Sequence, residues 1–407
     1  MLVIGTTQAV ERPNIIYFLA DDLGWTDVGW HGSEIKTPHL DKLAMEGARL
    51  EQFYVLPVCS PTRAAFMTGR YPIRHGLQLS VVRPWAQYGL PLEERTLPQA
   101  LKETGYRTAI CGKWHLGHFR PDYLPTHRGF DMQYGHYNGA LDYFTHDRDG
   151  GHDWHRNDQE NREVGYTTTL LGDEAVRIVE QLDPKTPLFL YVPFNAPHSP
   201  LQVTEAYREQ YAQISDKKRQ AYAAMVHCLD EQVGRVVEAI EKRGLTSNTL
   251  FLFSSDNGGP LDQGATNGKL RAGKATLYEG GTRVVACANW QGKIQPGTIV
   301  NEPMHIVDWY PTLLKLVGVS TDQTQNKAST KKKKKAAAKT DNQGDNQGVE
   351  LFNLAEDPYE KSNVASQHPN KVAELKARLD KYAREAIPPK AEEAQANFKA
   401  PKVWGER

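Results

Sequence analysis

The sequence predicts an α/β fold in which a large, mostly parallel sheet is sandwiched by helices. The chain has 407 residues, of which 39% are hydrophobic. Short runs rich in β-branched and aromatic residues alternate with segments of helical period, which is typical of a parallel sheet wrapped by helices. A chain of this length and apolar content can bury a sizeable core, so disorder is excluded for most of it.

The expected strands are short apolar runs, and most of them lead directly into polar residues or turns. They cover residues 14–20, 108–111, 188–194, 249–254 and 284–288. Segments of helical period lie between and around them, at 38–48, 96–104, 167–182, 217–243 and 307–316. Towards the end of the chain, residues 349–365 predict a short strand and a turn, and residues 369–386 predict a charged helix.

A change of composition divides the chain. Residues 320–348 are rich in Lys, Asn and Gln and include an unbroken run of lysines from Lys331 to Lys335. Such a stretch buries too little apolar surface to offset its ordering entropy, so a low-complexity linker or insert is the preferred interpretation. A nucleic-acid or heparin-binding patch is the weaker alternative. We therefore expect a large domain over 12–319, this linker, and a separate C-terminal part over 349–407.

The overall charge excludes some classes of partner. Lys plus Arg and Asp plus Glu both number 49, so no global field favours nucleic acid or an anionic membrane. No apolar run reaches the roughly 20 residues that a membrane-spanning helix needs. The N-terminus has a short apolar start but lacks a basic region and a full apolar core, so it is interpreted as an incomplete signal peptide.

One of the four cysteines lies in unusual surroundings. Cys111, Cys228 and Cys287 lie in apolar or helical segments, where a small buried hydrophobe is the expected role. Cys59 instead lies in "PVCSPTRAAFMTGR", between two prolines and ahead of a Thr-Gly-Arg turn. The cysteine spacing fits neither a disulfide-dense scaffold nor a paired-cysteine zinc site.

Polar side chains follow four of the predicted strands. A single instance would be explained by turn residues or helix caps, but four together favour a site, because ligands bind at the carboxyl ends of parallel strands. The residues in question are Asp21 and Asp22, Lys113 and His115, His198, and Asp256 with Asn257.

These residue types indicate a hard metal ion and an anionic substrate. Three carboxylates and an amide form a charge cluster that suits Ca²⁺ or Mg²⁺ rather than zinc. Arg63, Lys113 and Lys274 add fixed positive charge on expected loops. Together they would hold a tetrahedral oxyanion and stabilise charge as an ester bond breaks. The sequence thus predicts a hydrolase of anionic esters.

Two motifs resemble the signatures of a known family. "CSPTRAAFMTGR" resembles the C-x-P-x-R and T-G-R signature of the sulfatases, and "GKWHLG" resembles their second signature. Surrounding segments such as "FLADDLGWTDVGWHGS", "LPTHRGFD" and "SSDNGG" are similar to the arylsulfatase B (N-acetylgalactosamine-4-sulfatase) branch. The resemblance covers about residues 12–318 and implies a sulfatase catalytic domain with the fold of the alkaline phosphatase superfamily.

The resemblance also implies a cofactor and a role for each candidate residue. Cys59 would be oxidised to Cα-formylglycine by a formylglycine-generating enzyme, and its hydrate would be the nucleophile. Arg63 and Lys113 would hold that hydrate. His198, helped by Lys274, would protonate the leaving alcohol, and His115 would be the general base that releases sulfate. Lys113, His198 and Lys274 would contact the sulfate group. Ca²⁺, or less favourably Mg²⁺, would be bound by Asp21, Asp22, modified Cys59, Asp256 and Asn257.

The chain departs from the family after "DWYPTLLKLVG". Sulfatases continue there into a small antiparallel sheet with a W-K-L strand, whereas this chain has the lysine-rich segment. We therefore expect a truncated C-terminal subdomain over 349–407 that keeps its terminal helix.

The expected substrate is a sulfated carbohydrate, of the N-acetylgalactosamine-4-sulfate kind, or an aryl sulfate. Trp85, Tyr143, His146 and Trp154 are candidate sugar contacts. The expected location is periplasmic, secreted or lysosome-like. Two alternatives stay open: a phosphatase or phosphonate monoester hydrolase of the same superfamily, and a non-catalytic protein that binds sulfated glycans.

Overall fold

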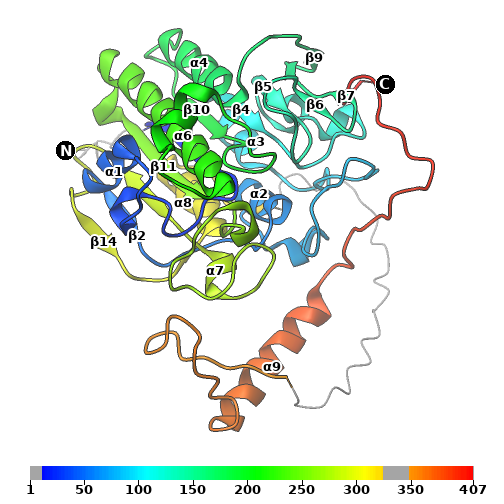
Figure 1. Ribbon diagram of the computed structural model, residues 1–407. Coiled ribbons are helices and arrows are strands. Elements are labelled where there is room, and N and C mark those ends of the chain that lie inside the picture. Colours follow the sequence, from blue (N-terminus) through cyan, green and yellow to red (C-terminus); the bar gives the residue numbers. More distant parts are fainter. Residues whose placement is uncertain (1–11, 324–347, 407) are drawn as a thin grey trace, which may run out of the picture.

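A mixed sheet with a parallel centre forms the core of the structure (Figure 1). The computed structural model describes residues 12–323 and 348–406. The ten strands of the main sheet follow the order β14-β2-β13-β11-β1-β10-β4-β5-β8-β9. The five central strands are parallel; they are β11 (Thr249–Ser255), β1 (Asn14–Ala20), β10 (Leu188–Pro193), β4 (Arg107–Lys113) and β5 (Met132–His136).

Shorter strands complete the sheet on both sides. Antiparallel pairs join β13 to β11 and β8 to β5, so the sheet is mostly parallel only at its centre. The outer strands are β2 (Ala48–Leu50), β8 (His155–Arg156), β9 (Gln159–Glu160), β13 (Ala286–Asn289) and β14 (Thr298–Val300). Two small further sheets contain β3 (Phe53–Tyr54), β12 (Arg283–Val284) and β15 (Met304–His305), and β6 (Asp147–Arg148) with β7 (Gly151–His152).

Helices cover both faces of the sheet, as predicted. Alternate residues of β1 supply two cores, because successive side chains of a strand point to opposite faces. Ile16 and Phe18 belong to the core with α1, α4 and α6, whereas Tyr17 and Leu19 belong to the core with α2, α3 and α8. The helices are α1 (Pro38–Met45), α2 (Cys59–Thr68), α3 (Leu97–Lys102), α4 (Thr167–Glu180), α5 (Glu205–Arg208), α6 (Lys217–Lys242), α7 (Glu279–Thr282), α8 (Trp309–Leu316) and α9 (Pro369–Glu385).

Two local predictions differ from the structure. Residues 59–68 are not among the predicted helices, but they form α2, because a proline is tolerated in the first turn of a helix. Only Gly69 makes the expected turn: its φ of 63° ends α2 in the left-handed region. The strand predicted within 349–365 is also wrong. Side chains there bind a loop of the α/β domain instead of pairing in a ladder.

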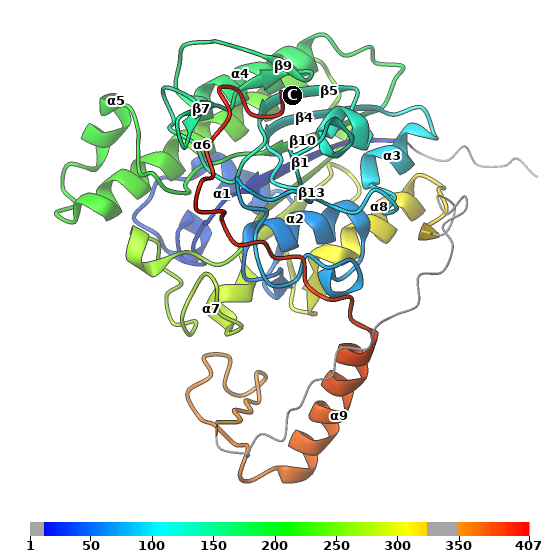
Figure 2. The same ribbon diagram turned by 90° about the vertical axis from the view of Figure 1, so that its right-hand side faces the viewer.

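The C-terminal part forms an appendage below the α/β domain (Figure 2). Helix α9 projects away from it and buries none of its residues. Residues 387–406, called the C-terminal strap below, then run back over the α/β domain. The first residues of the predicted linker also contact the domain, since Ser320 O accepts a bond from Arg95 and Gln323 donates to Thr68 O. The rest of the linker and the N-terminal signal-like segment lie largely outside the described residues.

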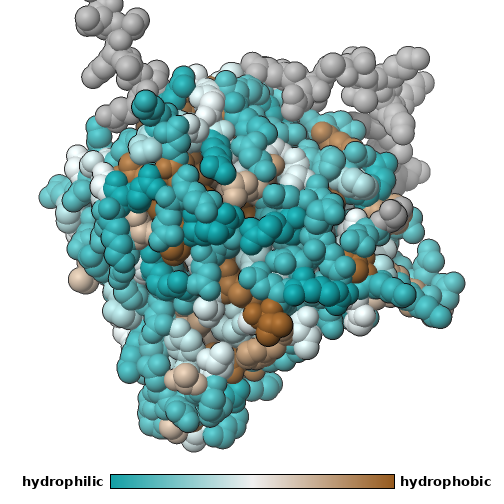
Figure 3. Space-filling model, turned by 90° about the horizontal axis from the view of Figure 1, so that it is seen from above, coloured by the Kyte–Doolittle hydropathy of each residue, from teal (hydrophilic) through white to brown (hydrophobic). Residues whose placement is uncertain are grey.

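The surface seen from above is mainly hydrophilic, with apolar residues in small separate groups (Figure 3). In the described ranges, no helix combines the length and the apolar character that crossing a bilayer requires.

Candidate active site

The predicted strand-end residues converge on one edge of the sheet. Strands β11, β1, β10 and β4 are neighbours and parallel, so the segments that follow them start side by side. The Asp256 amide donates to Ala20 O at 2.9 Å, and the Asp22 amide donates to Asp256 Oδ1 at 3.3 Å. The ends of β1 and β11 are thereby joined directly.

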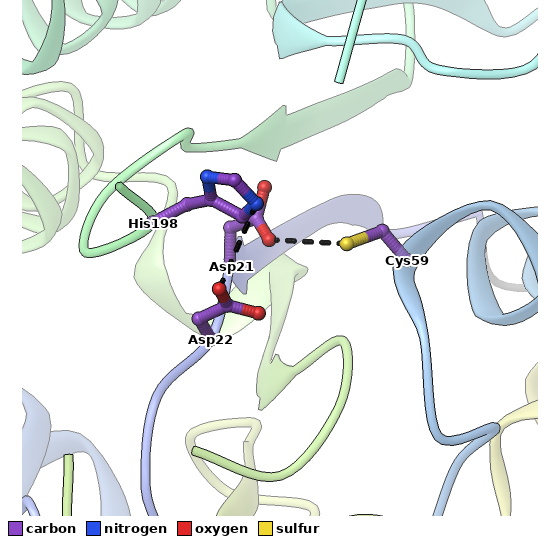
Figure 4. A group of neighbouring side chains, drawn as sticks. All are labelled: Asp21, Asp22, Cys59 and His198. Atoms are coloured by element: carbon purple, nitrogen blue, oxygen red, sulfur yellow. Dashed lines mark hydrogen bonds and ion pairs between the residues drawn. The ribbon is translucent and has the colours of Figure 1, made fainter. Parts of the chain in front are cut away.

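Helix α2 brings Cys59 to these carboxylates. Cys59 is the first residue of the helix, after Val58 in extended conformation, and its side chain is buried. Its Sγ donates to Asp21 Oδ1 at 3.4 Å (Figure 4). Burial raises the pKa of the Cys59 thiol, and the neighbouring Asp21 raises it further. The usual acidifying effect of a helix N-terminus is thus outweighed, and the unmodified thiol stays protonated.

Arg63 is also on α2, not on a loop as expected, and it links three strand ends. Its Nη2 lies 2.8 Å from Asp256 Oδ2 and 3.3 Å from Asp21 Oδ2, and its Nη1 donates to Lys113 O at 2.8 Å. Arg63 is 1% exposed, so these charge pairs are shielded from water. A buried guanidinium with these partners fixes the position of both carboxylates.

Two lysines pair with the aspartates of the first strand end. Lys113 is the last residue of β4 rather than a loop residue, and its ammonium donates to Asp21 Oδ2. Lys274 lies on a loop, as predicted, and its Nζ lies 2.6 Å from Asp22 Oδ1. His198, after β10, has its Nε2 at 3.7 Å from Asp22 Oδ2, while its Nδ1 pairs with Ser199 O at 2.6 Å. Burial lowers the pKa of His198.

The neighbouring cations do not fully cancel the repulsion between the carboxylates of Asp21 and Asp256. Burial alone raises the pKa of Asp21, but Lys113, His198 and Arg63 together lower it well below its usual value. For Asp256, burial and the nearby charge of Asp21 raise the pKa to about 6 in spite of Arg63. An additional cation at this edge would relieve that repulsion.

The donor set fits a hard divalent cation. Among the described residues, ligand atoms of Asp21, Asp22, Cys59 and His198 all lie within 4.8 Å of one another. Asn257 donates through Nδ2 to Asp22 Oδ1 at 2.7 Å, which leaves its buried Oδ1 without a hydrogen-bond partner in the described part of the chain. An unpartnered buried oxygen beside carboxylates is a suitable ligand for Ca²⁺ or Mg²⁺.

His115 lies in a tight pocket next to this cluster. Its Nε2 pairs with Val82 O at 3.1 Å, and its Nδ1 has no hydrogen-bond partner within the described ranges. Burial lowers the pKa of His115 well below its usual value, so the ring is neutral. A Cβ on Gly139 would lie 2.3 Å from His115 Cε1, so only glycine allows this close approach. A neutral imidazole with one free nitrogen can accept a proton.

Sequence reasoning missed Ser60 and gave Tyr143 a different role, although both residues hold this site together. Ser60 donates to His115 O at 2.8 Å and accepts from Val82 N at 2.9 Å. Tyr143 donates its hydroxyl to the carbonyls of Asn195 and His198, both at 2.7 Å. Ser60 follows the conspicuous Cys59 directly, but no local signal in the sequence marks Tyr143 as a support for His198.

Three of the four candidate sugar contacts are wrong. Tyr143, His146 and Trp154 are each at most 1% exposed, so they pack inside the domain and present no surface to a sugar. Trp85 is half-buried and stays available at the surface.

Known proteins resemble the chain in sequence. The Sulfatase family model matches residues 13–319. Arylsulfatase J of Mus musculus is 46% identical over 325 residues, which are 78% of this chain and 54% of that protein. N-acetylgalactosamine-6-sulfatase of Homo sapiens is 33% identical over 342 residues, 78% of this chain and 64% of that protein. The chain therefore spans between about half and two thirds of these relatives.

Solved structures resemble it over a larger share of their length. Ps i-CgsB, also solved in complex with k-i-k-neocarrahexaose, gives a TM-score of 0.84 at 33% identity and covers 93% of this chain and 94% of its own. A phosphonate monoester hydrolase of Agrobacterium radiobacter, at 19% identity and a TM-score of 0.62 over 91% of this chain and 95% of its own, shares the fold. The predicted alkaline phosphatase-like fold is confirmed, whereas the arylsulfatase B branch stays a prediction. By its sequence over residues 13–319 and by its fold, the chain belongs to the sulfatase family.

Proposed function

We propose that this chain hydrolyses sulfate esters of a glycan, so that one water is consumed and the alcohol and sulfate are released. One observation carries the proposal: Cys59 begins α2 with its Sγ 3.4 Å from Asp21 Oδ1, inside the cluster of carboxylates and buried cations. A soft thiol is a poor partner for a hard metal ion. Conversion of Cys59 to formylglycine places an oxygen at this position instead.

Two groups complete the proposed site. Asp21, Asp22, Asp256, Asn257 and the modified Cys59 would hold Ca²⁺, and a formylglycine-generating enzyme would modify Cys59 during maturation. The hydrated aldehyde supplies a nucleophilic oxygen, and the cation supplies Lewis-acid stabilisation of the sulfate charge. The orphaned Asn257 Oδ1 supports this donor set.

The chain's own residues have separate roles around the sulfate. Arg63 and Lys113 are buried cations that hold the nucleophilic side chain and neutralise charge near it. Lys274 and His198 approach Asp22 from different elements, and we assign to them contact with the sulfate and proton delivery to the leaving alcohol. Neutral His115, whose Nδ1 has no hydrogen-bond partner among the described residues, accepts the proton whose removal releases sulfate.

The proposed substrate is a sulfated sugar within a glycan. Relatives named N-acetylgalactosamine-6-sulfatase and the likeness to Ps i-CgsB, solved with a neocarrahexaose, support this class. An N-acetylgalactosamine-4-sulfate substrate is the finer expectation. Sulfate release from 4-sulfated and 6-sulfated N-acetylgalactosamine, measured side by side, tests the position of the ester.

The decisive experiment combines mass spectrometry with turnover. Protein coexpressed with a formylglycine-generating enzyme should give a peptide across Cys59 with the mass of the aldehyde, and it should hydrolyse 4-nitrophenyl sulfate faster than 4-nitrophenyl phosphate. Preference for the phosphate would favour a phosphatase or phosphonate hydrolase. Binding of a sulfated glycan by the modified protein without turnover would favour a binding protein. Either result would contradict the proposal.

A further inference from the structure

The C-terminal strap is attached to the α/β domain by main-chain hydrogen bonds. Ile387 N donates to Ile73 O at 2.8 Å, and Lys390 N donates to Gly76 O at 2.7 Å. Further along, Trp404 N donates to His152 O at 2.9 Å, and Trp404 is 3% exposed. The strap is thus fixed at both ends as it runs over the domain (Figure 2). Between these ends, Glu392 O accepts a hydrogen bond from Trp85, which lies on a loop of the domain.

A cavity lies between the strap and this loop. Its volume is about 570 Å³, within the range of small-molecule sites. A second cavity of about 530 Å³ shares Trp85 and Phe398 with it, so the hollow continues past these two rings. The side chains that decide the chemistry of the first cavity are Trp85, Phe398, Trp404, Glu392, Glu393 and Glu406.

Aromatic rings and hydrogen-bond acceptors line this cavity together. The ring centroids of Trp85 and Phe398 are 6.1 Å apart, and those of Phe398 and Trp404 are 6.3 Å apart. Trp85 Nε1 donates to Glu392 O at 2.8 Å, which fixes the indole against the strap. Phe398 is 37% exposed and offers apolar surface to a ligand. Apolar ring faces beside carboxylate acceptors suit a sugar, which has apolar C–H faces and hydroxyl donors.

The charge of the lining selects against anionic sugars. Glu392, Glu393 and Glu406 face one cation among the lining residues, Lys399. A sulfated or uronic sugar would be repelled there, whereas an uncharged sugar would not. The cavity therefore differs in charge preference from the cluster of Arg63, Lys113 and Lys274.

A short loop connects the cavity to the candidate active site. Val82 N bonds to Ser60, the neighbour of Cys59, and Val82 O bonds to His115. Trp85 follows Val82 by three residues, and three residues of chain span at most about 11 Å. The backbone at Trp85 and the backbone at Val82 are therefore close enough for a short oligosaccharide to span the distance between them.

We propose that this cavity is a subsite for an uncharged sugar that flanks the sulfated sugar in the glycan substrate. The proposal rests on the proposed function and deepens it. It predicts that the enzyme prefers oligosaccharides in which the sugar next to the sulfated sugar carries no sulfate. Trp85 and Phe398 provide the apolar faces, and the strap residues complete the wall.

The test compares a small and a large substrate with the full-length, modified protein. Phe398→Ala should lower kcat/KM about tenfold for a singly sulfated trisaccharide and leave 4-nitrophenyl sulfate within about twofold. Phe398→Trp should restore the trisaccharide rate. Leu379→Ala, at an exposed position on α9, is the matched control and should change neither substrate. An equal loss on both substrates, or no loss on either, would overturn the proposal.

Charge and binding provide two further readouts. A trisaccharide with a second sulfate on the flanking sugar should react more slowly than the singly sulfated trisaccharide. The double variant Glu393→Gln, Glu406→Gln should reduce the difference in rate between these two substrates. If the wild-type protein turns over no sulfate ester, the proposed function fails, and titration calorimetry with the unsulfated trisaccharide still tests the cavity. Binding that is lost in Phe398→Ala supports the subsite, and the absence of binding to the wild-type protein overturns it.

Discussion

The Arg63 ion pairs of the strand-end cluster are buried, whereas an ion pair that joins the C-terminal part to the α/β domain is exposed to water. In the cluster, Arg63 pairs with Asp256 at 2.8 Å, and both side chains are at most 1% exposed. In the C-terminal part, Arg74 pairs with Glu385 of α9 at 2.5 Å, but the two side chains are 31% and 43% exposed. Water screens the second pair and leaves the first unscreened. The proposed chemistry would thus depend on the buried cluster, whereas the C-terminal part would hold loops in place and line the proposed subsite.

The largest effect is expected from replacing Cys59, the proposed source of the nucleophile, because activity should be lost while the fold is kept. Cys59→Ala should reduce sulfate ester turnover by about a thousandfold or more, because no aldehyde can form. The melting temperature should change little, since within the described part of the chain the thiol makes one weak hydrogen bond, to Asp21. Activity and thermal unfolding are the measurements. Cys228→Ala, also at a buried cysteine, is the control and should keep activity. Wild-type turnover by Cys59→Ala would contradict the assignment.

The two arginine pairs provide the next comparison. Arg63→Met should lower the free energy of unfolding by about 3–5 kcal/mol, because Asp256 and Asp21 would be left buried without their guanidinium partner. Arg74→Met should lower it by less than about 1 kcal/mol. Urea denaturation of both variants at one pH gives the two values. Similar losses for both would remove the distinction between the regions.

The C-terminal part should affect both stability and kcat, because it supports the loop that contains Lys274. Glu360, after the predicted linker, accepts from the Glu279 amide at 2.8 Å, and Glu279 begins α7 behind that loop. Glu360→Ala should cost about 1–3 kcal/mol of stability and lower kcat severalfold, because a buried amide loses its partner. Glu374→Ala, on exposed α9, is the matched control. Unchanged kcat in Glu360→Ala would show that the loop holds its position alone.

A pH dependence of stability is expected from His75, which lies beneath the strap. Burial, together with the nearby cations Arg70 and Lys390, lowers the pKa of His75 to about 3. The unfolded chain protonates this ring near pH 6.5, whereas the folded chain does not, so stability falls as the pH drops from 6.5 towards 3. Between pH 7 and pH 5 the loss from His75 should be up to about 2 kcal/mol. His75→Phe should remove this part of the pH dependence of the urea midpoint. If the pH dependence of the urea midpoint were the same in His75→Phe and the wild-type protein, the folded protein would accommodate His75 in its protonated form.

Much of the central sheet could be predicted because its signal is local. The predicted strand over 14–20 matches β1, and the predicted helix over 217–243 ends one residue beyond α6. Both segments have a clear apolar pattern and are mostly buried. The helix over residues 59–68 is not predicted, and the strand predicted within 349–365 is wrong, because local sequence patterns do not show the tertiary contacts of these segments. The division into domains at 319 and 349 stays a prediction.

The sequence by itself determined the polar residues after each strand, the odd position of Cys59 and the resemblance to sulfatases. These features depend on residue types and short spacings. Only the tertiary structure decided which charges meet: Arg63 and Asp256 are 193 positions apart, and Lys274 and Asp22 are 252 apart. It also placed Phe398 of the strap beside Trp85. Such pairs form because the order of strands in the sheet, and the path of the strap back over the domain, bring distant segments together. No local sequence pattern encodes these long-range contacts.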